Sequence, residues 1–194
     1  GYLNEAVDHA LAYDPIRAVD LVEQDETNLL EQSKMTTLLG IVNKLPPQLV
    51  ASRARLQLTI AWANLLLQRQ GPMQAAVNRF EASMTNADLE ETTRADLKAE
   101  ADVLQAVAET HADRTENVEN LVAEAMSRPD TLHPQVPGVA GNIAAFAAIY
   151  RFDFDTAHRL LEWAWPYNEM VGPFSAVYGR CYGGIADRLS LIHI

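Results

Sequence analysis

The stretch LTIAWANLLLQRQGPMQAAVNRF, residues 58–80, decides the fold class of this chain of 194 residues. Its first half is apolar at almost every position, and its second half repeats apolar residues at the spacing of an amphipathic helix. Gly71 is expected to adopt the left-handed conformation that stops a helix, and Pro72 to begin the next one. The stretch therefore predicts an antiparallel helical hairpin whose first helix is covered on more than one side.

Helical periodicity continues from this hairpin toward the N-terminus. Apolar stripes predict one helix before Pro15, a second helix after it and a third from Lys34. Pro46 and Pro47 end the third helix, because proline disfavours helical geometry in the residue before it. The next helix is expected to begin near Arg53.

Acidic residues mark helix starts toward the C-terminus. Asp88 with Glu91, and Asp113 with Glu116, fit an acidic form of the capping box and predict two further helices. Asp153 is expected to cap a helix in the same way, and a last helix follows residue 173. The helix before Asp153 is expected to turn one stripe inward: Val139, Ile143, Phe146 and Tyr150.

The helix pairs recur at intervals of about 40 residues. Aligning the pairs at their turns brings four small or apolar residues to equivalent positions: Ala18, Ala75, Val118 and Ala157. Strand signals are nearly absent, so we predict an all-α fold of antiparallel helix pairs stacked as an α-solenoid like that of tetratricopeptide (TPR) repeats. We expect a single domain over residues 1–188 of a longer protein, and interpret residues 189–194 as a non-native tail.

Composition narrows the possible partners. The chain has 26 acidic and 15 basic residues, a formal charge of -11, and no basic patch that would bind nucleic acid. No apolar run reaches the length of a membrane span, so we expect a cytoplasmic protein without membrane contact. The single cysteine, Cys181, excludes an internal disulfide framework and is expected to be a buried thiol.

No constellation of residues predicts catalysis. The sequence contains no phosphate-binding loop, no nucleophile elbow and no pair of histidines at metal-binding spacing, so we expect no catalytic residue, metal or cofactor in this segment. Asn142 is strongly polar within an apolar helix and must bond either a neighbouring backbone, which we favour, or a bound effector. Tyr178 and Arg180 complete the candidate effector site, because Arg180 would reach an acidic effector across a concave surface.

Three stretches carry a resemblance to a known family. Residues 45–77 contain Leu45-Pro46-Pro47, an Ala-Trp-Ala core and a Leu-Leu-Leu-x-Arg-x-Gly end, and residues 6–24 and 141–164 contain comparable helices. Together they resemble the helical-repeat region of the large MalT-like transcriptional activators of the LuxR type. The resemblance covers residues 1–186, and its motifs are packing signatures that name no ligand.

The resemblance implies a sensor segment without catalytic activity. In that family, an ATPase module precedes the helical repeats and a helix-turn-helix DNA reader follows them, so ATP and DNA would be bound only by modules outside this chain. The segment would bind a small-molecule effector or a regulatory protein and transmit that binding, with self-association in the full-length protein. The alternative is a general TPR-like adaptor for protein–protein interaction with no role in transcription.

Overall fold

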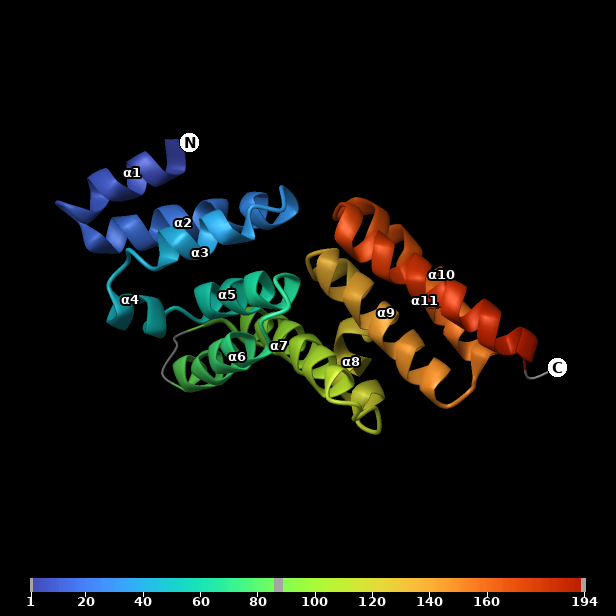
Figure 1. Ribbon diagram of the computed structural model, residues 1–194. Coiled ribbons are helices and arrows are strands. Elements are labelled where there is room, and N and C mark those ends of the chain that lie inside the picture. Colours follow the sequence, from blue (N-terminus) through green and yellow to red (C-terminus); the bar gives the residue numbers. More distant parts are fainter. Residues whose placement is uncertain (1, 86–88, 193–194) are drawn as a thin grey trace. The chain divides into compact units, whose positions relative to one another are not determined.

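The computed structural model describes residues 2–85 and 89–192, and the chain divides into two compact units, residues 1–97 and 98–194. The described residues form eleven α-helices and one short 3-10 helix, without a strand (Figure 1). The all-α prediction is therefore confirmed. The expectation of one domain over residues 1–188 stays a prediction.

The first unit consists of helices joined by short turns, and α1 and α2, α2 and α3, and α5 and α6 run antiparallel (Figure 1). Helix α2 packs on α1, α3 packs on α2, and both α2 and α3 pack on α5, whose partner is α6. Stacking of neighbouring helix pairs, as the sequence predicts, is confirmed here. The helices are α1 (Tyr2–Leu11), α2 (Pro15–Glu31), α3 (Met35–Val42), α4 (Pro47–Ser52), α5 (Ala54–Leu66), α6 (Gln70–Met84) and the beginning of α7 (Glu91–His111).

The second unit contains the rest of α7 and a tightly packed group of helices near the C-terminus. Helix α9 packs on α8, α10 and α11, and α10 also packs on α11. The remaining elements are α8 (Val118–Ser127), the 3-10 helix η1 (Pro129–Thr131), α9 (Gln135–Tyr150), α10 (Phe154–Met170) and α11 (Pro173–Ile192). Helix α11 continues into the expected tail, where Leu189 packs on the apolar cluster of this unit. The non-native origin of residues 189–194 stays a prediction, and His193 and Ile194 lie outside the described residues.

Helix α5 is covered on nearly all sides, as its continuous apolar sequence predicts. Eleven of its thirteen residues are buried, including Trp62. The polar exceptions have partners: the Gln57 amide donates to the Val50 carbonyl at 2.7 Å, and the Thr59 hydroxyl donates to the buried Glu26 of α2. Burial of polar groups is tolerated here because each forms a hydrogen bond.

The turn between α5 and α6 differs from the prediction. Gly71 does not end α5: it lies within α6, and Gln68 adopts the left-handed conformation, with a φ of 58°. The N–H of Gln68 donates to the Leu65 carbonyl at 2.9 Å, and the N–H of Arg69 donates to the Asn64 carbonyl at 2.8 Å. These two bonds satisfy the last carbonyls of the helix, so the turn closes before Gly71 despite the cost of a left-handed glutamine.

The same turn recurs at the ends of α2, α7 and α9, where Ser33, Asp113 and Phe152 have positive φ angles. The predicted capping box at Asp113 is therefore wrong, and α8 begins only at Val118. Asp113 instead accepts a hydrogen bond from the Tyr150 hydroxyl at 2.6 Å. The predicted cap at Asp153 is confirmed, since its carboxylate accepts from the Thr156 N–H at 3.1 Å. The capping box at Asp88 lies outside the described residues.

Two further expectations are corrected. The sequence analysis placed no helix between Pro46 and Arg53, where the structure has α4, because the two prolines begin this short helix as well as ending the preceding turn. Cys181 was expected to be buried and is exposed. It lies on the outer face of α11, whose inner positions are occupied by Ser175 and Ala186.

The inward face of α9 also differs from the predicted stripe. Ile143 is buried, but Tyr150 is 45% exposed, and the alanines of α9 are the most deeply buried residues. The reason is the close approach of α10: a Cβ atom added to Gly141 would lie only 2.6 Å from the Cβ of Ala164. Small side chains, which contribute little to a stripe in the sequence, define this interface.

This close approach predicts opposite effects of the same substitution at two glycines. Gly141→Ala should lower the free energy of unfolding by about 1–3 kcal/mol, because the new methyl group has no room. Gly184→Ala is the matched control, since nothing lies within 4 Å of a Cβ at that position in α11. It should raise stability by about 0.5–1 kcal/mol through helix propensity. Urea unfolding of both variants checks the prediction, and equal effects would contradict it.

Candidate functional site

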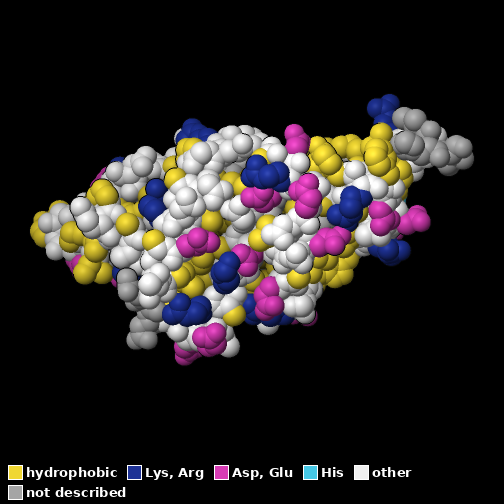
Figure 2. Space-filling model, turned by 90° about the horizontal axis from the view of Figure 1, so that it is seen from below, with side chains coloured by type: hydrophobic (Ala, Val, Ile, Leu, Met, Phe, Trp, Pro, Cys, Tyr) yellow, Lys and Arg dark blue, Asp and Glu magenta, His cyan; other side chains and the backbone are white. Residues whose placement is uncertain are grey.

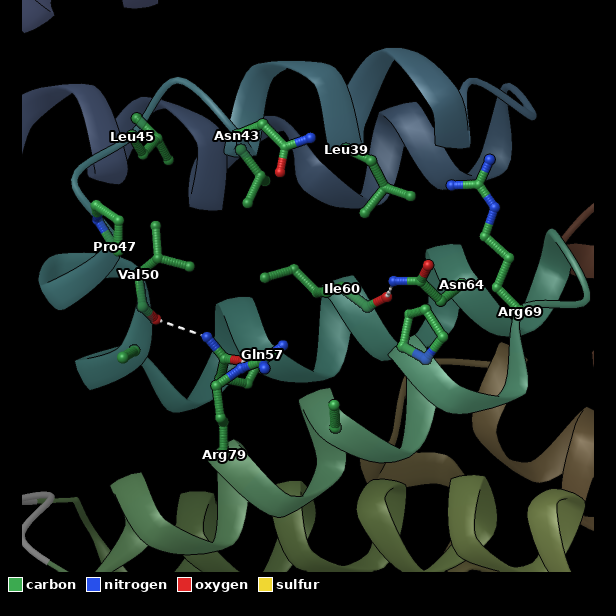
Figure 3. Close-up of a pocket in the computed structure, with 14 residues that line it drawn as sticks. Leu39, Asn43, Leu45, Pro47, Val50, Gln57, Ile60, Asn64, Arg69 and Arg79 are labelled. Atoms are coloured by element: carbon green, nitrogen blue, oxygen red, sulfur yellow. Dashed lines mark hydrogen bonds between the residues drawn. The ribbon is translucent and has the colours of Figure 1, made fainter.

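A groove in the first unit has a volume of about 660 Å³. We call it the α3–α6 groove. Side chains from α3 and the loop after it face side chains from α5, α4 contributes one wall, and α6 contributes another (Figure 3). Its lining consists of Leu39, Val42, Asn43, Leu45, Pro47, Val50, Ala51, Gln57, Ile60, Asn64, Arg69, Pro72, Ala75 and Arg79.

The charged lining residues of the groove are both arginines. Arg69, which follows α5, and Arg79 of α6 border the groove, and no aspartate or glutamate is among the residues that line it. Within the described part of the chain, neither guanidinium forms an ion pair. With two guanidinium groups and no carboxylate in its lining, this groove is locally positive in a chain of net charge -11.

Carboxamides supply the remaining polar groups of the groove. Gln57 accepts a hydrogen bond from the Nε of Arg79 at 2.9 Å and thereby holds this arginine against α5. The Asn64 amide donates to the Ile60 carbonyl at 2.8 Å, and its oxygen points toward the groove (Figure 3). Asn43 is exposed at the end of α3. The groove thus combines an apolar wall with a few placed polar groups, which is typical of binding sites.

The sequence analysis missed this groove, although some signals were present. Gln57 and Asn64 interrupt an otherwise apolar helix, and they lie seven residues apart, which places them on one face. The wall formed by α4 could not be found, because α4 itself was not predicted. The four residues that carry the polar chemistry, Gln57, Asn64, Arg69 and Arg79, are close only because α5 and α6 pack together.

The residues predicted from the sequence lie elsewhere, in the second unit. Asn142 is buried between α9, α10 and α11, where it exchanges hydrogen bonds with Asn168 at 3.0 and 3.3 Å. Its amide also donates to the Ser175 backbone carbonyl at 3.1 Å, and the Ser175 hydroxyl donates to Asn168. A backbone partner, the favoured interpretation, is therefore present, and Asn168 was not singled out in the sequence.

Tyr178 and Arg180 lie on α11 and do not converge with Asn142. The Arg180 guanidinium stacks on the ring of Trp165, 5.1 Å from its centroid. A shallow pocket of about 330 Å³ beside this pair is lined by Arg180 but by neither Asn142 nor Tyr178. The effector-binding role of the three residues stays a prediction.

The asparagine network predicts a large loss of stability on truncation. Asn168→Ala removes a partner of both Asn142 and Ser175 and should lower the free energy of unfolding by about 2–4 kcal/mol. Asn120→Ala is the control, because Asn120 is exposed on α8 and bonds only a local side chain. It should change stability by less than about 0.5 kcal/mol. Thermal and urea unfolding measure both, and a small effect at Asn168 would show that the network is dispensable.

The raised pKa of the partly buried Tyr182 predicts a loss of stability of the second unit at alkaline pH. It packs against the apolar cluster formed by α9, α10 and α11, and burial, followed by the proximity of Tyr178 and Cys181, raises the pKa of Tyr182 to about 12. Its ordinary pKa is near 10. The unfolded chain therefore releases this proton more readily, so stability is complete below pH 10 and is lost as the pH rises toward 12.

In Tyr182→Phe, this part of the alkaline loss should disappear. The difference from the unmodified chain should reach on the order of 2 kcal/mol across this range. Urea unfolding at successive pH values between 8 and 12 measures it. Tyr2→Phe is the control, because Tyr2 is 92% exposed. Identical pH profiles for Tyr182→Phe and the unmodified chain would contradict the prediction.

The described residues contain no group of three or more histidine, cysteine, aspartate or glutamate side chains that could hold a metal ion. None of the described helices is both long and apolar enough to cross a bilayer. On the face that Figure 2 presents, acidic and basic side chains are interspersed, and neither sign forms a continuous area. The geometry favours binding through the α3–α6 groove.

Comparison with known proteins relates this chain to a protein kinase. The serine/threonine-protein kinase PknK of Mycobacterium tuberculosis is 68% identical over 189 residues, which cover 97% of this chain. PknK of Mycobacterium bovis matches equally well. The chain spans 17% of the length of these curated relatives. No family model and no solved structure matches it.

A weaker similarity supports part of the family resemblance. The HTH-type transcriptional regulator MalT of Serratia proteamaculans is 29% identical over 127 residues, which cover 65% of this chain and 14% of the regulator. The similarity to MalT is thus distant, whereas the much more similar relatives are named as kinases. Because the match is to a helical region that makes up 17% of PknK, no enzymatic role is supported for this segment.

Proposed function

We propose that this chain is a regulatory helical segment of a larger PknK-like protein kinase, in which it binds a partner protein or effector and transmits that binding to the kinase. The observation that carries the proposal is the α3–α6 groove, located in a segment that matches PknK over 97% of its length. The similarity to MalT supports a sensing role for the helical repeats. The protein would act in the cytoplasm.

The mechanism follows from differential binding. A ligand alters the activity of a connected module only if it prefers one arrangement of the stacked helices. The groove is suited to this, because its lining comes from α3, α4, α5 and α6, and a ligand that contacts all of them would resist their relative movement. A bound ligand would therefore restrict the relative movement of α3, α4, α5 and α6 in the first unit.

A substitution that fills the groove tests the proposal in the full-length protein. Ala75 of α6 lines the groove and is half-buried, so Ala75→Trp should occupy the binding volume without removing a core side chain. We expect a change of about threefold or more in kinase activity, or in its response to the partner, because Ala75→Trp mimics or excludes the ligand. Phosphate transfer to a generic protein substrate is the measurement.

Ala82→Trp is the matched control on the same helix. Ala82 is exposed and does not line the groove, so this substitution adds the same ring to α6 without entering the cavity. It should leave kinase activity unchanged. If Ala75→Trp and Ala82→Trp both leave activity and its regulation unchanged while the protein stays folded, the regulatory proposal is wrong.

A second candidate function is a general TPR-like adaptor that binds partners without influencing a kinase or a transcription module. The solenoid-like stacking of helix pairs favours it equally. It predicts that Ala75→Trp abolishes partner binding but leaves kinase activity unchanged. The same pair of variants therefore separates the two candidates.

A further inference from the structure

We propose that the ligand of the α3–α6 groove is an extended acidic segment of a partner protein, held by ion pairs from its carboxylates to Arg69 and Arg79. This inference rests on the proposed function and adds the chemistry of the ligand. Arg69 and Arg79 line the groove without ion-pair partners among the described residues, and the lining contains no carboxylate.

The electrostatic contrast with the rest of the chain supports an anionic ligand. Two other cations of the first unit already have carboxylate partners: Lys44 pairs with Asp8 at 2.6 Å, and Arg53 pairs with Asp20 at 2.7 Å. Charge repulsion from a chain of net charge -11 would discourage an anion from binding at an arbitrary surface position. The guanidinium groups of Arg69 and Arg79 therefore supply the positive charges that an acidic ligand needs.

The hydrogen-bonding groups favour a peptide. Asn43 and Asn64 each present a carboxamide beside the groove, and a carboxamide both donates and accepts as a peptide bond does. Figure 3 places Ile60 and Asn64 along α5 between Gln57 and Arg69. The main chain of an extended peptide lying along α5 would find carboxamide side chains as hydrogen-bond partners, and its side chains would contact an apolar wall in the same groove.

The length of α5 sets the spacing of the acidic residues. Gln57, which holds Arg79, lies near the beginning of this helix of 13 residues, and Arg69 follows its end. The helix is about 20 Å long, and an extended peptide advances about 3.3 Å per residue. A span of this length corresponds to about six positions of an extended chain, so we expect the two carboxylates within about six positions of each other in the partner segment.

Fluorescence polarisation with the 194-residue chain tests the ligand class. The probes are labelled peptides with two glutamates two to six positions apart and aliphatic residues between them, and the same peptides with glutamine in place of glutamate. We expect the best acidic peptide to bind at least about tenfold more tightly than its glutamine counterpart, and this preference to decrease as salt is raised. Equal affinity for both forms, or no binding across the panel, would overturn the proposal.

Variants locate the interaction. Replacing either arginine by glutamine, in Arg69→Gln or Arg79→Gln, should lower the affinity for the acidic peptide about three- to tenfold. Replacing it by lysine, in Arg69→Lys or Arg79→Lys, should retain part of the affinity. Arg17→Gln is the charge-matched control, because Arg17 is exposed on α2 and does not line the groove. It should change affinity less than twofold. Equal losses in Arg17→Gln and the groove variants would indicate general charge attraction and overturn the assignment.

Two further results separate this inference from the proposed function. If inorganic pyrophosphate raises the melting temperature through Arg69 and Arg79 while no acidic peptide binds, the groove holds a small anion and the peptide assignment is overturned. If glutamine peptides bind as tightly as acidic ones and Ala75→Trp blocks both, only the acidic ligand is overturned. The proposed function itself depends on the effect of Ala75→Trp on the full-length protein.

Discussion

Burial of α5 on nearly all sides is the constraint on which the first unit depends. A helix with apolar residues around its whole circumference cannot be stable beside water, and each large side chain that is covered contributes about 1.5–3 kcal/mol. Helices α2, α3, α4 and α6 pack around α5 and supply this cover. Its polar side chains are tolerated because Gln57, Thr59 and Asn64 all form hydrogen bonds.

The groove is a consequence of how this cover is built. Helices α3 and α4 have eight and six residues, the loop between them ends at Pro46, and α4 begins with Pro47, so they do not form one continuous helix along α5. Their side chains therefore face those of α5 and α6 across an open volume. A groove thus arises where short covering helices meet a longer covered one, and the arginines of α6 and of the α5–α6 turn give it charge.

In the second unit, the helices near the C-terminus pack closely through glycines. Helices α9, α10 and α11 approach closely because Gly138, Gly141 and Gly179 leave no side chain between them. Part of this interface is polar, since Asn142 and Asn168 bond each other beside Gly138 and Gly179. A paired carboxamide network of this kind fixes one register of the helices, because any sliding would leave buried polar groups without partners.

The sequence by itself determined the all-α class, the helix starts at Pro15, Asp153 and Pro173, and the continuous burial of α5, because local propensity and apolar periodicity carry that information. It also indicated that Asn142 needs a partner. It did not determine that partner, since Asn168 and Ser175 follow 26 and 33 residues later. Tertiary structure alone decided which turn residue is left-handed, how the alanines of α9 are buried, and that Arg69 and Arg79 share a groove. These features depend on contacts between helices distant in sequence, and a periodic pattern within one helix does not record them.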